Sequence, residues 1–456
     1  MYIKKVKISH IRAINQLTLT FDKPAGWHVL IGDNGAGKST IVRSIALALL
    51  NQVDINATRE DWDDWLSQDK KEGSIQLDVL ADKKYDQGLI SDEDGVIKNK
   101  IVFERYYKPT ESDTDEITLS EQKKEEDIWD VRVVGVSGVR IKELKFGNQT
   151  VLGADATATN LDLRKGWFAA AYGPFRRFTG GSPEKEKVYK SNPYLGAVLS
   201  VFGEDVALSE ALTYIRELFI RELYTHNPKN TSELSTVDYL KKFMNEAELL
   251  PHQVTIDEIN ANVILFKDAN GRRISTLQMS DGFRSVLSLT LELIRQLIAV
   301  YNPKRVFDDV IKGGKTIDLP GVVLIDEVDA HLHPTWQTKI GKWFTDHFPN
   351  IQFIVTTHSP LICRAAEKGT IWHLPTPGSG ETLQEITGVK RKRLIFGNVL
   401  DAYGTGVFGE KTAISEDSND KRNELAELNV KSMLGQISEP EEQQLNELRS
   451  IFPTKG

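Results

Sequence analysis

The segment 32–39, which reads Gly-Asp-Asn-Gly-Ala-Gly-Lys-Ser, constrains the fold of this chain more than any other feature. It fits the pattern G-x-x-x-x-G-K-[ST], in which a glycine-rich loop holds phosphate groups at the start of a helix. The context agrees, because residues 27–31 predict a buried strand and residues 39–50 predict an apolar helix. Glycines let the backbone approach phosphate oxygens that side chains would block. A glycine turn without this role is the less favoured alternative.

The polar residues of this loop have separate expected roles. Lys38 is expected to reach the β- and γ-phosphates of a nucleoside triphosphate, and Ser39 to ligate Mg²⁺. The residues expected to bind the nucleotide here are Asn34, Gly35, Ala36, Gly37, Lys38, Ser39 and Thr40.

Two carboxylates follow a second apolar segment. Residues 322–325 are too short for a helix and rich in branched side chains, so they predict a parallel core strand. Asp326 and Glu327 stand at its carboxyl end, the edge where open α/β sheets bind ligands. We expect Asp326 to hold Mg²⁺ and Glu327 to polarise the attacking water. An ordinary strand end solvated by acids is the alternative, weakened by the phosphate loop.

Two further motifs follow the same order along the chain. His358 comes after the predicted strand 351–355, where an imidazole can donate a hydrogen bond toward a γ-phosphate. The segment 280–284, Ser-Asp-Gly-Phe-Arg, precedes a helical run at 286–297, so its amides suit an anion. Ser280 and Asp281 also favour helix capping, and the two roles are compatible.

These motifs resemble those of the ABC-type ATPase heads of the RecF, SMC and Rad50 group. The segment 280–284 is similar to their signature motif, Asp329 to their D-loop residue, and His358 to their switch histidine. The resemblance covers about residues 1–55 and 255–375. It implies an α/β fold, an ABC-type P-loop ATPase head with a mixed sheet and an inserted helical arm.

The resemblance also implies how the site is assembled. The cofactors would be ATP and Mg²⁺, with Glu327 and His358 as catalytic residues and Ser39 and Asp326 as magnesium ligands. The signature residues Ser280, Gly282 and Arg284 of one copy would reach the ATP of another, in an ATP-sandwich dimer or a higher homo-oligomer. Arg12, in a predicted first hairpin of segments 8–12 and 17–21, would approach the nucleotide.

More narrowly, the pattern resembles the ATPase subunits of Septu anti-phage defence, the PtuA family. The segments 168–177 and 329–334 and the acidic C-terminal tail are similar to that group. The resemblance implies ATP hydrolysis and a separately encoded HNH-type nuclease partner, with DNA bound through the complex. The chain itself would not be a nuclease.

One departure from ABC heads leaves two alternatives open. Such heads usually carry a Gln at the end of a strand beside the magnesium, and the turn at 171–173, Ala-Tyr-Gly, has none. Either a glutamine is supplied from elsewhere or hydrolysis is slow.

Two other functions stay open. One is a RecF-like ATPase of DNA repair, which binds DNA itself, and the other is an ATP-gated scaffold in which hydrolysis is incidental.

Composition excludes several classes of protein. The net charge of −8 argues against a protein that coats nucleic acid. A single cysteine, Cys363, excludes an internal disulfide or a cysteine zinc site. No apolar run is long enough to span a membrane, and the start leads directly into a strand pattern, so a cytoplasmic location is expected. The basic segments 176–177, 272–273 and 390–393 predict solvated surface charge.

The expected organisation is a split ATPase. Residues 1–55 form the first part of the head, 56–204 an inserted β-rich region, and 205–250 a helical arm without the heptads of SMC proteins. Residues 251–375 carry the signature motif, the two carboxylates and the histidine, and 376–456 a strand and two helices. The stretch 111–127 is expected to be a surface loop. A final apolar face, comprising Leu445, Leu448, Ile451 and Phe452, is expected to pack on the chain's own core rather than on a partner.

Overall fold

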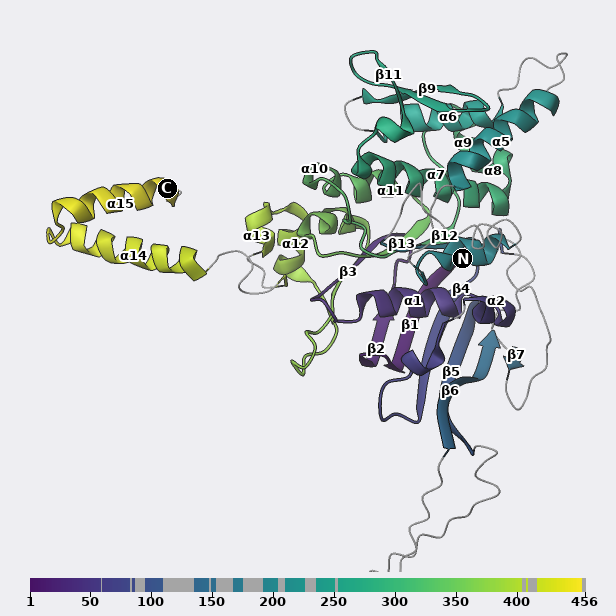
Figure 1. Ribbon diagram of the computed structural model, residues 1–456, viewed down its shortest axis with the longest axis horizontal. Helices are drawn as coiled ribbons and strands as arrows, with labels where there is room; N and C mark the ends of the chain where they lie inside the picture. The colour runs from purple at the N-terminus through teal and green to yellow at the C-terminus, as the bar shows by residue number, and fades with distance from the viewer. Residues whose placement is uncertain are drawn as a thin grey trace, which may run out of the picture.

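The computed structural model of the 456-residue chain describes residues 1–58, 60–82, 84–86, 95–109, 135–146, 149–152, 167–174, 192–203, 210–225, 235–250, 253–403, 407–408 and 416–452. The predicted surface loop 111–127 and the arginine pair 176–177 lie outside these residues. Figure 1 shows a central sheet with helices on both sides, a second sheet beyond one helical layer, and a helical hairpin that stands apart at the C-terminal end.

A mixed six-stranded sheet carries the phosphate loop. Its order is β15-β14-β3-β13-β12-β8. The strands are β3 (Gly26–Ile31), β8 (Ala169–Tyr172), β12 (Gly321–Ile325), β13 (Ile351–Thr356), β14 (Ile371–His373) and β15 (Gln384–Glu385). Neighbouring strands from β14 to β8 pair in parallel, whereas β15 pairs antiparallel to β14. The strands predicted around the phosphate loop, the paired carboxylates and the histidine are confirmed, and their carboxyl ends meet at one edge.

Two helices cover opposite faces of this sheet. They are α1 (Lys38–Ala48) and α7 (Asp281–Tyr301). In β3, Val29 belongs to the core around α7, and the next residue, Leu30, belongs to the core around α1. In β12, Val323 and Leu324 divide in the same way. Because successive side chains of a strand point to opposite faces, the continuous apolar runs of these strands reflect burial on both sides.

An antiparallel sheet packs on the far side of α1. It comprises, in spatial order, β2 (Ile14–Thr20), β1 (Tyr2–Ile11), β4 (Glu72–Leu80), β5 (Val96–Pro109), β6 (Gly135–Phe146) and β7 (Gln149–Leu152). Ile8 and Ile75 on its buried face share one core with Ile41 of α1. The first hairpin is confirmed, with β1 starting six residues before the predicted segment. The connection from α1 holds α2 (Gln52–Ala57) and a 3-10 turn, η1 (Trp62–Asp64).

The helical part of the chain lies above α7 in Figure 1. It contains α5 (Glu210–Thr225) and α6 (Thr236–Glu246) and a small sheet of β9 (Thr255–Ile259), β10 (Ile264–Lys267) and β11 (Arg273–Ser275). The helices α5 and α6, of 16 and 11 residues, are short, as the lack of heptads predicts. The remaining elements up to β14 are α4 (Pro193–Leu199), η4 (Thr276–Gln278), α8 (Pro303–Val306), α9 (Asp308–Ile311), α10 (Pro334–Gln337), α11 (Ile340–His347) and η5 (Pro360–Lys368).

Within its described residues, the C-terminal part has four helices, where the sequence predicted two. They are α12 (Gly388–Phe396), α13 (Val399–Tyr403), α14 (Glu416–Met433) and α15 (Glu439–Ile451). The basic run 390–393 obscured α12, because it leaves few apolar residues to show a helical period. The apolar face of α15 packs within the chain, but through Leu445 and Leu448 in a small separate core with α14, and Ile451 is 49% exposed.

The α/β fold of a P-loop ATPase is therefore confirmed, whereas the division of the chain into five segments stays a prediction. Cys363 is buried and unpaired. Burial raises the pKa of its thiol, so it packs as an apolar residue. Among the described residues, the structure shows no helix that is long and apolar enough to cross a membrane.

One buried histidine of β3 should make stability depend on pH. His28 Nε2 donates to the Pro24 carbonyl at 2.8 Å, and Nδ1 lies 2.9 Å from the hydroxyl of Thr370. Burial lowers the pKa of His28 to about 4. Because the unfolded chain takes up this proton near pH 6.5, stability is full above that pH and falls as pH drops toward 4, by about 3 kcal/mol.

The variant His28→Gln tests this dependence. Denaturant unfolding of the wild type between pH 7 and pH 4.5 should show the decline, and the variant should show a smaller one. An equal slope in both proteins would assign the acid sensitivity to other groups.

Candidate functional site

The loop between β3 and α1 has the backbone conformation that its glycines allow. Gly35 and Gly37 have φ of 80° and 93°, values that side chains disfavour. A Cβ on Gly37 would lie 3.1 Å from Cγ1 of Ile14, at the start of β2. The turn between β1 and β2 therefore lies against the phosphate loop, and only a glycine leaves room for it.

The Lys38 ammonium lies inside this loop. Its Nζ donates to the carbonyls of Gly32 and Asp33 at 2.8 and 2.9 Å. Burial lowers the pKa of Lys38, while Asp326 and nearby carboxylates act in the opposite direction. Lys38 thus lies within electrostatic reach of the carboxylates that follow β12, two strands away from β3 in the sheet. Ser39 is half-buried and Thr40 buried, while Asn34 and Gly35 are exposed.

A threonine at the end of β13 contacts the carboxylate of Asp326 and the backbone of Glu327. The hydroxyl of Thr356 donates to Oδ1 of Asp326 at 2.6 Å and accepts the backbone N–H of Glu327 at 2.7 Å. Thr356 is fully buried and Asp326 is 4% exposed. Glu327 has φ of 47°, so the chain turns sharply where the strand ends. This contact orients Asp326 and sets the direction of the following residue.

The next threonine holds the following loop in the same way. The hydroxyl of Thr357 donates to Oδ1 of Asp329 at 2.6 Å and accepts the N–H of Ser359 at 2.9 Å. Because Thr357 directly precedes His358, one short segment links the exposed histidine to the D-loop position. The hydroxyl of Ser359 donates to Oε1 of Gln337 at 2.6 Å and fastens the segment further.

The signature segment lies at the start of α7. Ser280 occupies the N-cap position, but its side chain makes no capping hydrogen bond and is exposed. The first N–H groups of a helix have no partner within it, so this end suits an anion. A Cβ on Gly282 would lie 2.9 Å from the carbonyl of His331, so glycine allows the D-loop to pack on α7. Arg284 forms an ion pair with Asp281.

The side chain of Arg12 is held by two residues that the sequence did not point to. Its guanidinium is 3.3 Å from the carboxylate of Glu60 and 4.8 Å from the ring centroid of Trp65. The Trp65 indole N–H donates to the same carboxylate at 2.9 Å. Arg12 belongs to the turn that lies against Gly37, so it is close to the phosphate loop, but here its cation is balanced by Glu60.

Close packing explains why a small residue follows β8. A Cβ on Gly173 would lie 2.2 Å from the carbonyl of Ser200. The Ser200 hydroxyl also donates to the carbonyl of Ala171 at 3.0 Å and accepts the Gly173 N–H at 3.2 Å. The strand end next to Asp326, where ABC heads usually carry a glutamine, is therefore occupied by the end of α4.

The structure brings Lys38, Asp326 and Glu327 to one edge of the sheet. The signature residues lie on α7, across the sheet from α1, and no hydrogen bond or ion pair of the described residues joins them to the phosphate loop. Sequence analysis missed Thr356, Thr357 and Glu60. The Thr-Thr pair before His358 was the available signal, whereas nothing in the sequence marked Glu60. Among the described residues, no cluster of three metal-binding side chains is present.

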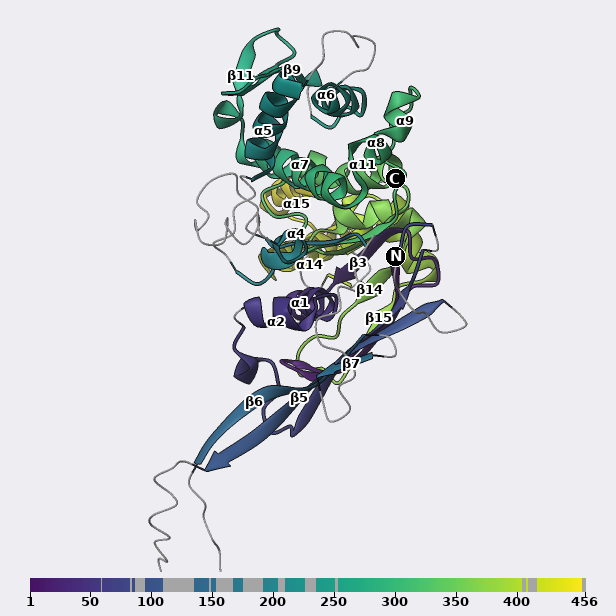
Figure 2. The same cartoon turned by 90° about the vertical axis from the view of Figure 1, so that its right-hand side faces the viewer.

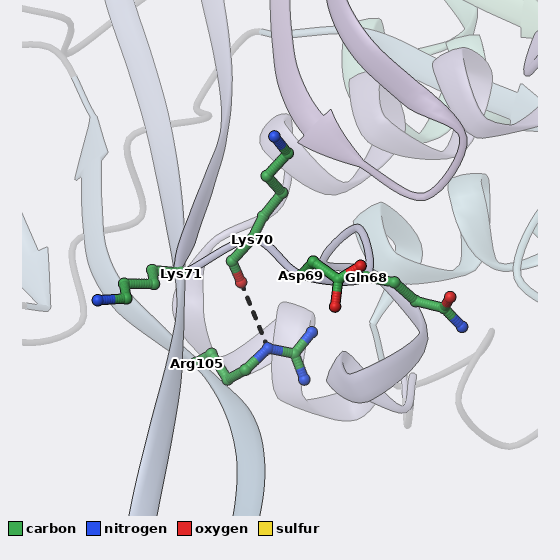
Figure 3. Close-up of a pocket in the computed structure, with 5 residues that line it drawn as sticks. All are labelled: Gln68, Asp69, Lys70, Lys71 and Arg105. Atoms are coloured by element: carbon green, nitrogen blue, oxygen red, sulfur yellow. Dashed lines mark hydrogen bonds between the residues drawn. The ribbon is translucent and has the colours of Figure 1, made fainter.

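A surface hollow of about 360 Å³ is lined by other residues (Figure 3). They are Gln68, Asp69, Lys70, Lys71 and Arg105. The side chains of Gln68, Lys70 and Lys71 point in different directions, and Arg105 Nε donates to the Lys70 carbonyl at 3.3 Å. Because these side chains do not converge on one point, we assign the hollow no function.

Removal of the Thr356 hydroxyl should destabilise the fold. Thr356→Val leaves a buried carboxylate oxygen and an amide without this partner, which costs about 1–3 kcal/mol of unfolding free energy. Thr356→Ser keeps the hydroxyl and should cost less. Denaturant unfolding of both variants measures the difference, and equal losses would show that the methyl group, not the hydrogen bonds, matters.

Two protein-family models match this chain, one in its N-terminal part and one in its later part. Residues 5–150 match an AAA domain model, and residues 208–364 match the model described as AAA domain, putative AbiEii toxin, Type IV TA system. Solved structures with weak likeness include an SMC head bound to the C-winged helix domain of ScpA (TM-score 0.47, 16% identity, 85% of this chain and 98% of that chain). Another is RecF with ATP (TM-score 0.37, 13% identity, 84% of this chain and 99% of that chain).

Two curated relatives cover most of the chain. The retron Ec83 probable ATPase of Escherichia coli is 25% identical over 85% of this chain and 73% of its own length. The Septu protein PtuA of Bacillus mycoides is 24% identical over 81% of this chain but only 40% of its own length. A PtuA of Bacillus thuringiensis is 38% identical over 23% of this chain and 24% of its own length. The resemblance predicted from the motifs is confirmed: the chain is similar, over most of its length, to a retron ATPase and to Septu PtuA.

Proposed function

We propose that this chain is an ATP-hydrolysing subunit of a bacterial anti-phage defence system, which oligomerises around ATP and regulates a separate HNH-type nuclease. The observation that carries the ATPase part is the position of Lys38 inside the phosphate loop, facing Asp326 across parallel strands. The matches to AAA domain models and to ATPase-named relatives support the same activity. The defence role rests on the retron and Septu relatives.

The residues present fit ATP with Mg²⁺. Gly37 leaves the backbone open, and the N-terminus of α1 can receive the phosphates. Lys38 would bind the β- and γ-phosphates, and Ser39 and Asp326 offer the oxygen ligands that magnesium prefers. The metal would neutralise charge that develops on the phosphates. Glu327, directed by its backbone contact to Thr356, would orient and deprotonate the attacking water.

The signature residues of a second copy would complete this site. Ser280 keeps its hydroxyl out of a capping bond, and Gly282 brings the D-loop against the same helix start. Arg284 and the first amides of α7 add positive charge. Because α7 covers the face of the sheet opposite to α1, a partner is the natural source of these groups for the ATP of one chain. His358 would sense the γ-phosphate, and Thr357 would transmit its position to Asp329.

Hydrolysis by this chain should be slow. The end of β8 presents Tyr172 and Gly173, packed against Ser200, and no glutamine beside Asp326. An ATP-gated scaffold therefore remains the second candidate function, and a RecF-like repair ATPase the third. ATP turnover, measured with and without DNA and the nuclease partner, separates the three candidate functions. Of the three, only a repair ATPase should respond to DNA in the absence of the partner.

Lys38→Ala should weaken ATP binding, and Glu327→Gln should preserve binding while stopping turnover. Loss of charge-assisted hydrogen bonds to phosphate should weaken affinity by about 10- to 100-fold. Loss of water activation should lower kcat by about 100-fold or more. Calorimetric titration and phosphate release measure the two effects, with exposed Lys70→Ala as the control. Wild-type turnover by Glu327→Gln would refute its role as base.

A mixture of two inactive variants should regain part of the activity. Lys38→Ala lacks an intact phosphate loop, and Ser280→Arg lacks an intact signature. In an antiparallel pair of the two chains, one site has both parts intact. Random pairing makes about half of the dimers mixed, and one of the two sites is complete in each, so turnover should rise toward about a quarter of the wild-type rate. Lys38→Ala mixed with Glu327→Gln sets the baseline, because no site in that mixture has both an intact phosphate loop and Glu327. No recovery, with mixed oligomers demonstrated by mass, would reject the assignment in trans.

A further inference from the structure

The helix α12 presents an unusual outer face. Its inner face anchors it to the body of the chain, because Leu394 and Ile395 are buried and Arg391 donates to the carbonyls of Ala366 and Gly369 at 2.7 and 3.2 Å. The outer face combines apolar and basic side chains. Val389 and Phe396 are 67% and 70% exposed, and Lys392 and Arg393 lie between them at helical spacing.

The hairpin of α14 and α15 has the complementary surface. Its own core is small, formed by Leu425, Leu428, Leu445 and Leu448. Outside this core, Val430, Met433 and Leu434 are 56%, 86% and 64% exposed. Asp420 and Glu427 stand ten and three residues before Val430, so the acidic and apolar side chains share one face of α14.

The charges of the two surfaces are opposite. Residues 416–451 contain nine acidic and four basic residues, a net charge of −5, while the whole chain carries −8. Residues 388–396 contain four basic residues and no acidic one. Figure 1 shows the hairpin standing apart from the rest of the chain, with α12 and α13 on the side of the body that faces it. Both surfaces therefore offer exposed apolar groups bordered by charge of opposite sign.

We propose that the α14–α15 hairpin of one copy docks on the outer face of α12 of a second copy. Exposed apolar patches of this kind mark interaction sites, and burying Phe396 against Met433 and Leu434 would remove apolar area from water. Lys392 and Arg393 would lie next to Asp420 and Glu427, which selects the register and the partner. The occupant is a second copy of this chain, since the matching surface is present in the chain itself.

This contact is distinct from the ATP-dependent pairing under the proposed function. None of the loop, carboxylate, histidine or signature residues belongs to α12 or to the hairpin. The contact should therefore form without nucleotide and in the Lys38→Ala chain. Each copy would carry one hairpin and one α12 face, so two contacts of this type can close a pair or link successive pairs.

Charge reversal in the full chain tests the proposal. One variant is Lys392→Glu with Arg393→Glu, and the other is Asp420→Lys with Glu427→Lys. Sedimentation velocity over a range of concentrations, without nucleotide, measures self-association. Each variant alone should associate about tenfold more weakly or worse, because like charges then face each other. An equimolar mixture should recover, since the acidic α12 of one variant meets the basic hairpin of the other.

Four controls accompany this measurement. The variant Lys7→Glu with Lys71→Glu alters the net charge by the same amount, at exposed positions in the region of the antiparallel sheet. This variant should associate like the wild type. Met433→Ser with Leu434→Ser should weaken association without altering charge. Near-native circular dichroism confirms that each variant is folded. Higher salt should weaken the wild-type contact through screening.

Three outcomes would overturn the proposal. The first is a monomer at all concentrations, and the second is association that survives both reversals. The third is that each variant loses self-association and the equimolar mixture does not recover it. That result would place the contact within one chain. This test is made without nucleotide, so its outcome does not depend on whether the chain binds ATP. The proposed contact and the proposed ATPase function can therefore fail separately.

Discussion

The parallel pairing of β13 with β3 on one side and β12 on the other is the constraint on which the rest of this structure depends. It brings β3 to the same edge of the sheet as two segments that follow about 300 residues later in the chain. β3 delivers the loop with Lys38, β12 delivers Asp326 and Glu327, and β13 delivers Thr356 between them. The Thr356 hydroxyl contacts Asp326 and Glu327, which follow the neighbouring strand. The register between β12 and β13 therefore fixes the geometry of the candidate site.

The same edge of the sheet would connect the bound nucleotide to the start of α7, where a second chain would bind. Two successive threonines act on two different parts of the site: Thr356 on Asp326, and Thr357 on Asp329. The D-loop in turn packs against Gly282 at the start of the signature helix. A shift at His358 on γ-phosphate binding would therefore be transmitted through short, rigid contacts to Asp329 and α7. Under the proposed function, even a slow ATPase could act as a switch, because ATP binding alone would change the oligomer surface.

Much of the fold and the site could be predicted because the motifs are local. The loop 32–39 and the carboxylates after 322–325 stand next to apolar runs that predict strands, and both strands are confirmed. The chemical roles of these residues stay predictions. Contacts that depend on distant segments left no such trace. Glu60 and Trp65 reach Arg12 across the turn, and Ser200 fills the place beside Gly173. The charged helix α12 was missed for another reason: its inner face is narrow, and its outer face mixes charge with apolar residues, which hides the period.

The central claim is that ATP binds this chain at the edge formed by Lys38 and Asp326 and joins two copies there. Native mass spectrometry of the Glu327→Gln chain, with and without ATP and Mg²⁺, tests it most directly. The account predicts that nucleotide increases pairing and that each added pair retains two ATP molecules, one for each phosphate loop. Chains that bind one ATP each with no change in assembly, or that retain none, would contradict it.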